Sequence, residues 1–409
     1  MANDSFGFSI AIEGNIMVIG APYHDYDSAG DNKLDDAGAV YVFYKNTGGT
    51  DNWGFVKKLV GKGTNGRMAS DNFGFSVGLS GDVIVVGASD QNYDSAGGNA
   101  MGNSGAAYVF YRNSGGTDNW GFVKKLTGKG TNGRVAGDNF GNAVAIDGDI
   151  IAVGAFNQDY DDVGSSTITN SGAIYVFNKN SGGTDNWGIV AKRTTEVSAT
   201  GFILVNSGRL GRTIAVDGDV IVAGAAGDQY DSATLSGIVT GAGAAYVFER
   251  NTGGTNNWGF MKKLVGKGTN GRIAQDGFGR SLGISGDIIA VGTYQQDYDS
   301  AGGNSATDAG AVFIYNRNSG GTNNWGFVKK ITGTGTNGRV AGDGFGKSLS
   351  ISGDTIVVAA YLQDYDSAGG NSVTDAGAAY IFNRSSGGTD NWGLGEKNNR
   401  HRNKRQNCK

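Results

Sequence analysis

The chain has 409 residues, of which 74 are glycine and only one is proline, and its formal net charge is −4. Glycine without a three-residue period excludes collagen, an aromatic content of 10% excludes a disordered chain, and the acidic balance argues against general nucleic-acid binding. Abundant glycine, together with enough apolar residues for a core, points to tight turns between strands and therefore to an all-β protein.

Cysteine content and hydropathy narrow the class of protein further. The single cysteine, Cys408, excludes an internal disulfide and a cysteine-based zinc site. No stretch reaches the ~18 apolar residues that a membrane-spanning helix needs. The start of the chain lacks the charged and apolar parts of a signal segment. We therefore expect either an intracellular chain or one that is without its leader.

Two sequence markers recur in register along the chain. One is tryptophan, at intervals of 67 to 71 residues, and the other is phenylalanine or leucine followed by glycine, at intervals of 67 to 70 residues. The tryptophans are Trp53, Trp120, Trp187, Trp258, Trp325 and Trp392. The second marker is at Phe6, Phe73, Phe140, Leu210, Phe278 and Phe345. Two independent markers with one spacing indicate six copies of one structural unit.

The third copy shows the first two strands of the unit. In residues 140–146 every second residue after the Phe-Gly marker is apolar, and residues 149–155 are mostly apolar. Asp147-Gly148 lies between these two runs, which predicts a tight hairpin with a type I′ turn.

The second half of the unit adds two more strands. A long polar loop at 156–171 leads to a third β-patterned run at 172–177. A polar turn at 180–186 then leads to Trp187, which precedes the fourth run. In other copies a glycine-rich connector, such as residues 61–67, carries the chain to the next unit. Each copy is therefore expected to be a four-stranded antiparallel sheet.

Six copies of four strands predict a β-propeller, because sheets that stack radially as blades cover each other's apolar faces. The first strand, small and glycine-rich as at 74–78, is expected to line the channel, and the lysines of the fourth strand suit an outer edge. A β-solenoid is the alternative fold, and a seven-bladed or truncated ring is the alternative to six blades. We expect the propeller to occupy residues 1–395 and the basic segment 396–409 to be a disordered tail.

These residues resemble the FG-GAP repeat family, whose repeat forms the propeller of the integrin alpha subunit. The FG corresponds to residues 6–7 and their copies, and the GAP to residues 20–22, which later copies keep only in part. The resemblance covers residues 3 to about 393. It implies a propeller with a non-enzymatic role in adhesion or recognition, in an extracellular or cell-surface location.

Two features depart from the pattern of that family. The resemblance implies a calcium loop between the FG and GAP strands, but a two-residue turn such as Asp147-Gly148 leaves no room for one. Propellers of the family generally have seven blades, whereas six copies are visible here. The last copy ends in a poor fourth strand at 392–397, and the connector of the fourth copy is degenerate at 194–206. The chain is therefore expected to be six-bladed or truncated.

The loops between the second and third strands carry the main candidate site. Tyr-Asp occurs in all six loops, and in four of them another aspartate precedes the tyrosine. Acids that alternate along a bendable loop supply the clustered oxygens that calcium needs, which makes calcium the one cofactor suggested. The alternative is that each aspartate caps its own loop and each tyrosine packs against the next blade. The candidate calcium ligands are Asp25, Asp27, Asp159, Asp161, Asp297, Asp299, Asp364 and Asp366. The candidate ligand-contacting tyrosines are Tyr26, Tyr93, Tyr160, Tyr230, Tyr298 and Tyr365.

The connectors between copies carry a second recurrent pair of charges. An arginine such as Arg67 lies six residues before the Phe-Gly marker, and an aspartate such as Asp71 lies two residues before it. We expect the two side chains of one connector to pair with each other. Strand direction alternates within a blade, so the connectors and the Tyr-Asp loops are expected to share one face. Function concentrates on long loops held by a rigid scaffold, so any metal or partner is expected on that face.

Two enzyme-like motifs lack the structural context that they require. Gly-x-Gly-x-x-Gly at 61–66 precedes a strand, whereas a dinucleotide fingerprint precedes a helix. Gly-x-Ser-x-Gly at 74–78 lies within a predicted strand and not at a strand-to-helix elbow, and the only histidines are His24 and His401. The sequence therefore predicts a protein that is not an enzyme. It predicts instead a propeller with a protein or glycan ligand, without a nucleic-acid partner or a membrane span.

Two other classes of function stay open at this point. One is a structural module of a longer repeat protein, with no ligand of its own. The other is a carbohydrate-active propeller enzyme, which would need two suitably spaced carboxylates.

Overall fold

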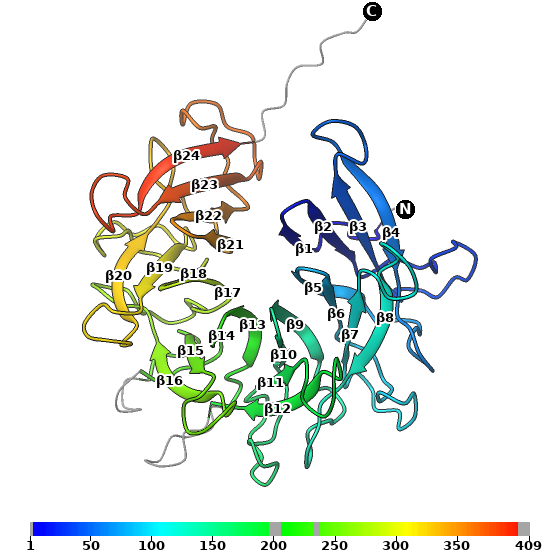
Figure 1. Ribbon diagram of the computed structural model, residues 1–409. Coiled ribbons are helices and arrows are strands. Elements are labelled where there is room, and N and C mark those ends of the chain that lie inside the picture. Colours follow the sequence, from blue (N-terminus) through cyan, green and yellow to red (C-terminus); the bar gives the residue numbers. More distant parts are fainter. Residues whose placement is uncertain (1–2, 196–205, 232–237, 400–409) are drawn as a thin grey trace, which may run out of the picture. The chain divides into compact units, whose positions relative to one another are not determined.

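The computed structural model describes residues 3–195, 206–231 and 238–399. These residues contain 24 strands and no helix, arranged as six four-stranded sheets. None of them forms a helix that is long and apolar enough to cross a membrane. The protein is all-β, and its fold class is the β-propeller with antiparallel blades, as the six sequence copies predicted (Figure 1).

Each blade takes its four strands in chain order, so neighbours in the sequence are neighbours in the sheet. The first blade contains β1 (Ser9–Glu13), β2 (Ile16–Ala21), β3 (Ala39–Lys45) and β4 (Trp53–Leu59). The second contains β5 (Phe73–Ser80), β6 (Val83–Ala88), β7 (Ala106–Tyr111) and β8 (Gly121–Leu126). The third contains β9 (Phe140–Asp147), β10 (Ile150–Ala155), β11 (Ala173–Asn178) and β12 (Gly188–Arg193). The fourth contains β13 (Leu210–Asp217), β14 (Val220–Ala225), β15 (Ala244–Glu249) and β16 (Gly259–Leu264). The fifth contains β17 (Ser281–Ser285), β18 (Ile288–Thr293), β19 (Ala311–Asn316) and β20 (Gly326–Ile331). The sixth contains β21 (Phe345–Ser352), β22 (Thr355–Ala360), β23 (Ala378–Asn383) and β24 (Gly393–Asn399).

The chain divides into two compact units, which are described separately. One unit comprises residues 1–223 and 247–261, and the other comprises residues 224–246 and 262–409. The division falls within the fourth blade, so the first unit holds the first three blades and the second unit holds the last two.

The hairpin between the first two strands of each blade has the predicted length but a different turn. Asp147 pairs with Ile150, so the two central residues are Gly148 and Asp149. The positive φ, 53°, is at the first of them, Gly148. This is the glycine position of a type II′ turn, and the prediction of a type I′ turn was therefore wrong.

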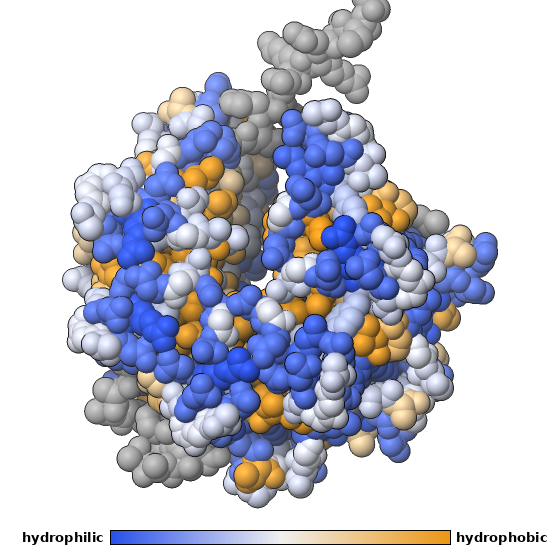
Figure 2. Space-filling view, in the orientation of Figure 1, coloured by the Kyte–Doolittle hydropathy of each residue, from blue (hydrophilic) through white to orange (hydrophobic). Residues whose placement is uncertain are grey.

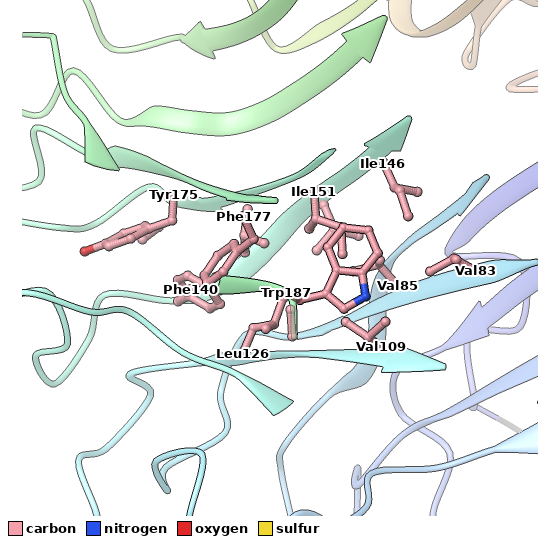
Figure 3. Packing of buried hydrophobic residues seen from close by; sticks show 14 of the residues in the cluster. Val83, Val85, Val109, Leu126, Phe140, Ile146, Ile151, Tyr175, Phe177 and Trp187 are labelled. Atoms are coloured by element: carbon pink, nitrogen blue, oxygen red, sulfur yellow. The ribbon is translucent and has the colours of Figure 1, made fainter. Parts of the chain in front are cut away.

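The two sequence markers meet in the core between blades. In the third blade Phe140 and Trp187 lie in one buried cluster with Val85, Val109 and Leu126 of the second blade (Figure 3). The indole Nε1 of Trp187 also donates a hydrogen bond of 2.8 Å to the Tyr111 hydroxyl of the second blade. The recurrent aromatic residues are therefore the side chains that join one blade to the blade before it.

The first blade differs from the others in the exposure of these markers. Phe6 is 55% exposed, whereas its equivalents Phe73 and Phe140 are at most 1% exposed. Trp53 is half-buried, whereas the five later tryptophans are fully buried. Apolar residues elsewhere lie mostly inside the blades, and Figure 2 shows hydrophilic residues over most of the face in view.

The end of the last copy is more regular than its sequence suggested. Gly393–Asn399 forms a full strand, β24, which pairs with β23 along its length. Paired strand thus continues past the expected boundary at residue 395. The rest of the predicted tail, 400–409, lies outside the described residues, as does most of the degenerate connector at 194–206.

Candidate functional site: the Tyr-Asp loops and the carboxylates beneath them

The connectors contact the loops between the second and third strands, as the alternation of strand direction predicted. Asn65, in the connector after the first blade, donates a side-chain hydrogen bond of 2.9 Å to the main-chain carbonyl of Gly97 in the loop of the second blade. Asn132 makes the same contact with Gly164 at 3.1 Å. A Cβ on Gly97 would lie 2.4 Å from the carbonyl oxygen of Thr64, so loop and connector are in close main-chain contact. The two kinds of segment therefore form one interlocked surface.

Outside the fourth blade, the aspartate of each Tyr-Asp pair closes its own loop. Asp27 Oδ1 accepts hydrogen bonds from the main-chain N–H groups of Ala29, Gly30 and Asp31, at 2.8–3.1 Å. Its Oδ2 accepts one of 2.5 Å from the Asn32 side chain. These donors, the Asn32 amide first among them, hold the pKa of Asp27 well below its usual range. Asp27 is thus an ionised cap for the turn that follows it.

The same capping recurs in later copies. Asp299 accepts hydrogen bonds from the N–H groups of Ala301, Gly303 and Asn304, and these donors, with Gly303 first, lower its pKa to about 2. The aspartate before the tyrosine caps the far end of the loop: Asp297 accepts from the main-chain N–H of Asp308 at 2.9 Å. Its counterparts Asp25, Asp159 and Asp364 accept equivalent bonds from residues eleven positions later in the chain. The carboxylates therefore order the loops directly.

In the first, third and sixth blades, main-chain carbonyl oxygens of the loop accept hydrogen bonds from a lysine of the fourth strand. Lys192, on the fourth strand of the third blade, donates to the carbonyls of Tyr160 and Asp161 at 2.9 and 2.8 Å. Lys397 does the same in the sixth blade, with Tyr365 and Asp366, at 3.2 and 3.0 Å. Among the described residues, no group of three or more His, Cys, Asp or Glu side chains could hold a metal ion. Calcium binding by these loops stays a prediction.

The arginine and the aspartate of a connector have different partners, contrary to the predicted pair. Arg67 donates through Nη2 to the loop carbonyls of Asp25 and Asn32, at 2.7 and 3.1 Å. Asp71 instead accepts from the N–H of Met68 at 2.6 Å and from the Gln91 side chain at 2.7 Å. The arginine therefore fastens the connector to the loop, and the aspartate turns inward.

A buried carboxylate lies beneath each of four loops, in a network that the sequence analysis missed. Asp138 Oδ2 accepts from the N–H of Val135 and from Nε2 of Gln158, at 2.6 and 2.9 Å. Gln158 Oε1 accepts from the N–H of Tyr160, and the Tyr175 hydroxyl donates to the carbonyl of Gly133. The sequence feature that could have revealed this network is a glutamine two residues before the tyrosine of the loop. It recurs as Gln91, Gln158, Gln296 and Gln363.

The two remaining blades keep one carboxylate in a different arrangement. In the first blade His24 occupies the glutamine position, and its Nδ1 lies 2.7 Å from Asp4. In the fourth blade the connector position is Gly208, and the glutamine position is Asp228, which pairs with Lys263 at 2.8 Å. In the fourth blade a buried carboxyl group thus still lies next to the buried lysine, although it comes from the loop and not from the connector.

Burial raises the pKa values of Asp71, Asp138 and Asp276, each to about 7. The folded protein therefore holds protons between about pH 4 and pH 7 that the unfolded chain has released, so stability falls as the pH rises through this window. The free energy of unfolding of the wild type should fall between pH 5 and pH 8. In the Asp138→Asn variant we expect this fall to be about 2 kcal/mol smaller. Urea unfolding of both proteins at pH 5 and pH 8 measures the difference. An equal fall in the wild type and in the variant would contradict a protonated Asp138.

The serines of the Gly-x-Ser-x-Gly sequences have structural partners. Ser76 Oγ donates to the carbonyl of Gly141 at 2.8 Å, and Ser281 Oγ donates to that of Gly346 at 2.7 Å. Each bond joins the first strand of one blade to the first strand of the next. These hydroxyls therefore act as links between blades.

Comparisons with known proteins agree with the repeat. The family model described as FG-GAP repeat matches residues 1–43, 53–110, 120–177 and 325–382, which together are more than half of the chain. Among solved structures, the computationally designed Ika8 protein is 13% identical, with a TM-score of 0.43, over 98% of this chain and 88% of that one. No curated protein matches the chain.

Proposed function

The chain belongs to the FG-GAP repeat family, and from this premise we propose that it is a non-enzymatic binding protein of the adhesion type. Its recognition surface is the loop face, defined within each of the two units as the Tyr-Asp loops and the connectors that contact them. Such a role implies an extracellular or cell-surface location, and a protein is the ligand that the loop face fits best.

The observation that carries this proposal is that some of the exposed apolar side chains of the protein lie on the Tyr-Asp loops. Met101, Val163 and Val373 are on loops between second and third strands and are 39%, 72% and 47% exposed. Their loops are held by capping aspartates and by lysine and arginine side chains, so these residues sit on ordered main chain. Ordered apolar side chains with a polar surround are typical of a protein–protein contact, and preorganised loops reduce the entropy lost on binding.

The tyrosines support the same surface. All six, including Tyr26 and Tyr160, are half-buried. Tyr26, Tyr160, Tyr298 and Tyr365 each form a β-bridge across their own loop. A tyrosine held in this way offers apolar area and a hydroxyl at low conformational cost.

The test compares the two ends of the blades. Labelled protein is applied to arrays of extracellular ectodomains and of glycans, and the strongest interaction is measured again with variants. We expect Asp297→Asn with Asp299→Asn, and separately Val163→Ser, to weaken binding about tenfold, a loss of ~1.4 kcal/mol. The control, Asn318→Ala with Asn323→Ala, changes the turn between β19 and β20, which lies at the other end of the fifth blade.

Two outcomes would contradict the proposal. One is a loss of binding in the control pair alone. The other is a folded wild-type protein that binds nothing on either array. Native mass spectrometry with and without calcium tests the metal separately, because a bound ion adds a defined mass.

A further inference from the structure

The hairpin turn of the first blade has a residue that the other copies lack. The position after the turn glycine is Asn15 in the first copy and aspartate in the other five: Asp82, Asp149, Asp219, Asp287 and Asp354. The main chain is the same in both cases, since Asn15 accepts from the N–H of Lys45 at 3.0 Å, and Asp149 accepts from that of Lys179 at 2.9 Å. Only the charge of the side chain differs.

In two other places this aspartate receives an arginine from the following blade. Arg250 donates to Asp149 with both terminal nitrogens, through Nη2 at 2.9 Å and Nη1 at 3.3 Å. Arg384 donates to Asp287 with both terminal nitrogens, at 3.1 Å each. A guanidinium that binds a carboxylate through two parallel hydrogen bonds is the strongest of the common ion-pair geometries.

Arg112 of the second blade is placed in the same way but faces Asn15. Its Nε bonds to Asp118 at 2.5 Å, and its Nη1 lies 3.5 Å from Asp82 of its own blade. Arg384 has the same two neighbours, Asp390 at Nε and Asp354 3.5 Å from Nη1. The difference is that Arg384 also holds a carboxylate of the preceding blade, whereas the bonds of Arg112 to described residues use Nε and Nη1 only.

The place of the missing carboxylate is a pocket of about 530 Å³. Its lining includes Glu13, Asn15, Tyr44, Lys45, Asp82 and Arg112. The guanidinium of Arg112 lies over the Tyr44 ring, 5.0 Å from its centroid, which fixes its plane at the pocket wall. The pocket lies at the hairpin end of the blades, away from the loop face.

We infer that this pocket binds a ligand through one carboxylate group, which takes on Arg112 the position that Asp149 has on Arg250. Lys45 adds a second positive charge to the lining, and its ammonium group also pairs with Asp51 at 3.2 Å. Glu13 and Asp82 in the same lining disfavour a second negative charge on the ligand. The ligand is therefore a monocarboxylate, either a small free acid or one acidic side chain of a peptide.

The direct test uses N-acetyl-aspartate amide, with N-acetyl-asparagine amide as the uncharged isostere, in an NMR titration of the arginine side-chain signals. Wild-type protein should bind the aspartate derivative with saturation and at least about tenfold more tightly than the asparagine derivative. Asn15→Asp should abolish binding, because its own carboxylate fills the position, whereas Asn15→Ala should retain it. Binding by Asn15→Asp at the wild-type level, or no saturation with the wild type, would overturn the inference.

Two further measurements make the result independent of folding defects. Asn15→Asp should raise Tm, because it restores the ion pair seen at Arg250 and Arg384, and an unchanged or lower Tm counts against the inference. Asp149→Asn should open an equivalent site and raise the stoichiometry from one ligand to two. Acetate distinguishes the source: affinity equal to that of the aspartate derivative indicates a free acid, and much weaker binding indicates a peptide side chain.

Discussion

Replacing Trp187 with alanine is expected to lower the free energy of unfolding by about 3–5 kcal/mol, the usual cost of deleting a large buried aromatic side chain. Trp187 is 0% exposed and packs in a cluster drawn from two blades. The change also leaves the Tyr111 hydroxyl without the 2.8 Å hydrogen bond from the indole. Urea unfolding followed by circular dichroism gives the value.

Trp53 provides a matched control from the same position of the repeat. It is half-buried and begins β4, whereas Trp187 precedes its strand with a positive φ of 47°. We expect Trp53→Ala to cost less than half as much as Trp187→Ala, because less apolar area returns to water. Equal losses would mean that the tryptophan stabilises its own blade and not the contact between blades.

Replacing Gly105 with alanine is expected to destabilise the protein by about 2–5 kcal/mol, from backbone strain together with overpacking. Gly105 has a φ of +82°, and a Cβ built on it would lie 2.0 Å from the carbonyl oxygen of Phe140. It forms a parallel β-bridge with Phe140, at the start of the next blade. The two blades would have to separate to admit a methyl group, and chemical denaturation measures the cost.

Gly137 separates the two causes. Its φ is +85°, close to that of Gly105, but no atom lies within 4 Å of a Cβ built on it. Gly137→Ala should therefore cost only the strain, about 1–2 kcal/mol. If both substitutions cost the same, close approach between blades contributes nothing at Gly105.

Much of the fold follows from short-range patterns. Alternating apolar residues after each Phe-Gly marker, a glycine-containing turn and a second apolar run define a hairpin from about fifteen adjacent residues, as at 140–155. The constant spacing of the two markers gave the number of blades, and the structure confirms six. The prediction of the turn type was wrong because the type depends on the φ angles of both central residues, whereas the sequence shows only that one of them is glycine.

The candidate site was predicted less completely. The loops were correctly identified as a face shared with the connectors, but the partners of their charged residues were not. Arg67 was paired with the nearest acid in the sequence, Asp71, whereas it binds carbonyls 35 and 42 residues away. Sequence proximity fails here because a main-chain carbonyl leaves no trace in the sequence.

The sequence by itself determined which residues form strands and turns and how many blades there are, because these depend on side-chain periodicity and on residues close along the chain. Only the tertiary structure decided what each charge does. Asp138 became a buried acid through Gln158, twenty residues away, and Arg250 found Asp149 at a separation of 101 residues. Where the aspartate is absent, as at Asn15, the same geometry leaves a pocket. Such pairings depend on which blades are neighbours in space, and electrostatic and hydrogen-bond energies depend on that distance and not on distance along the chain.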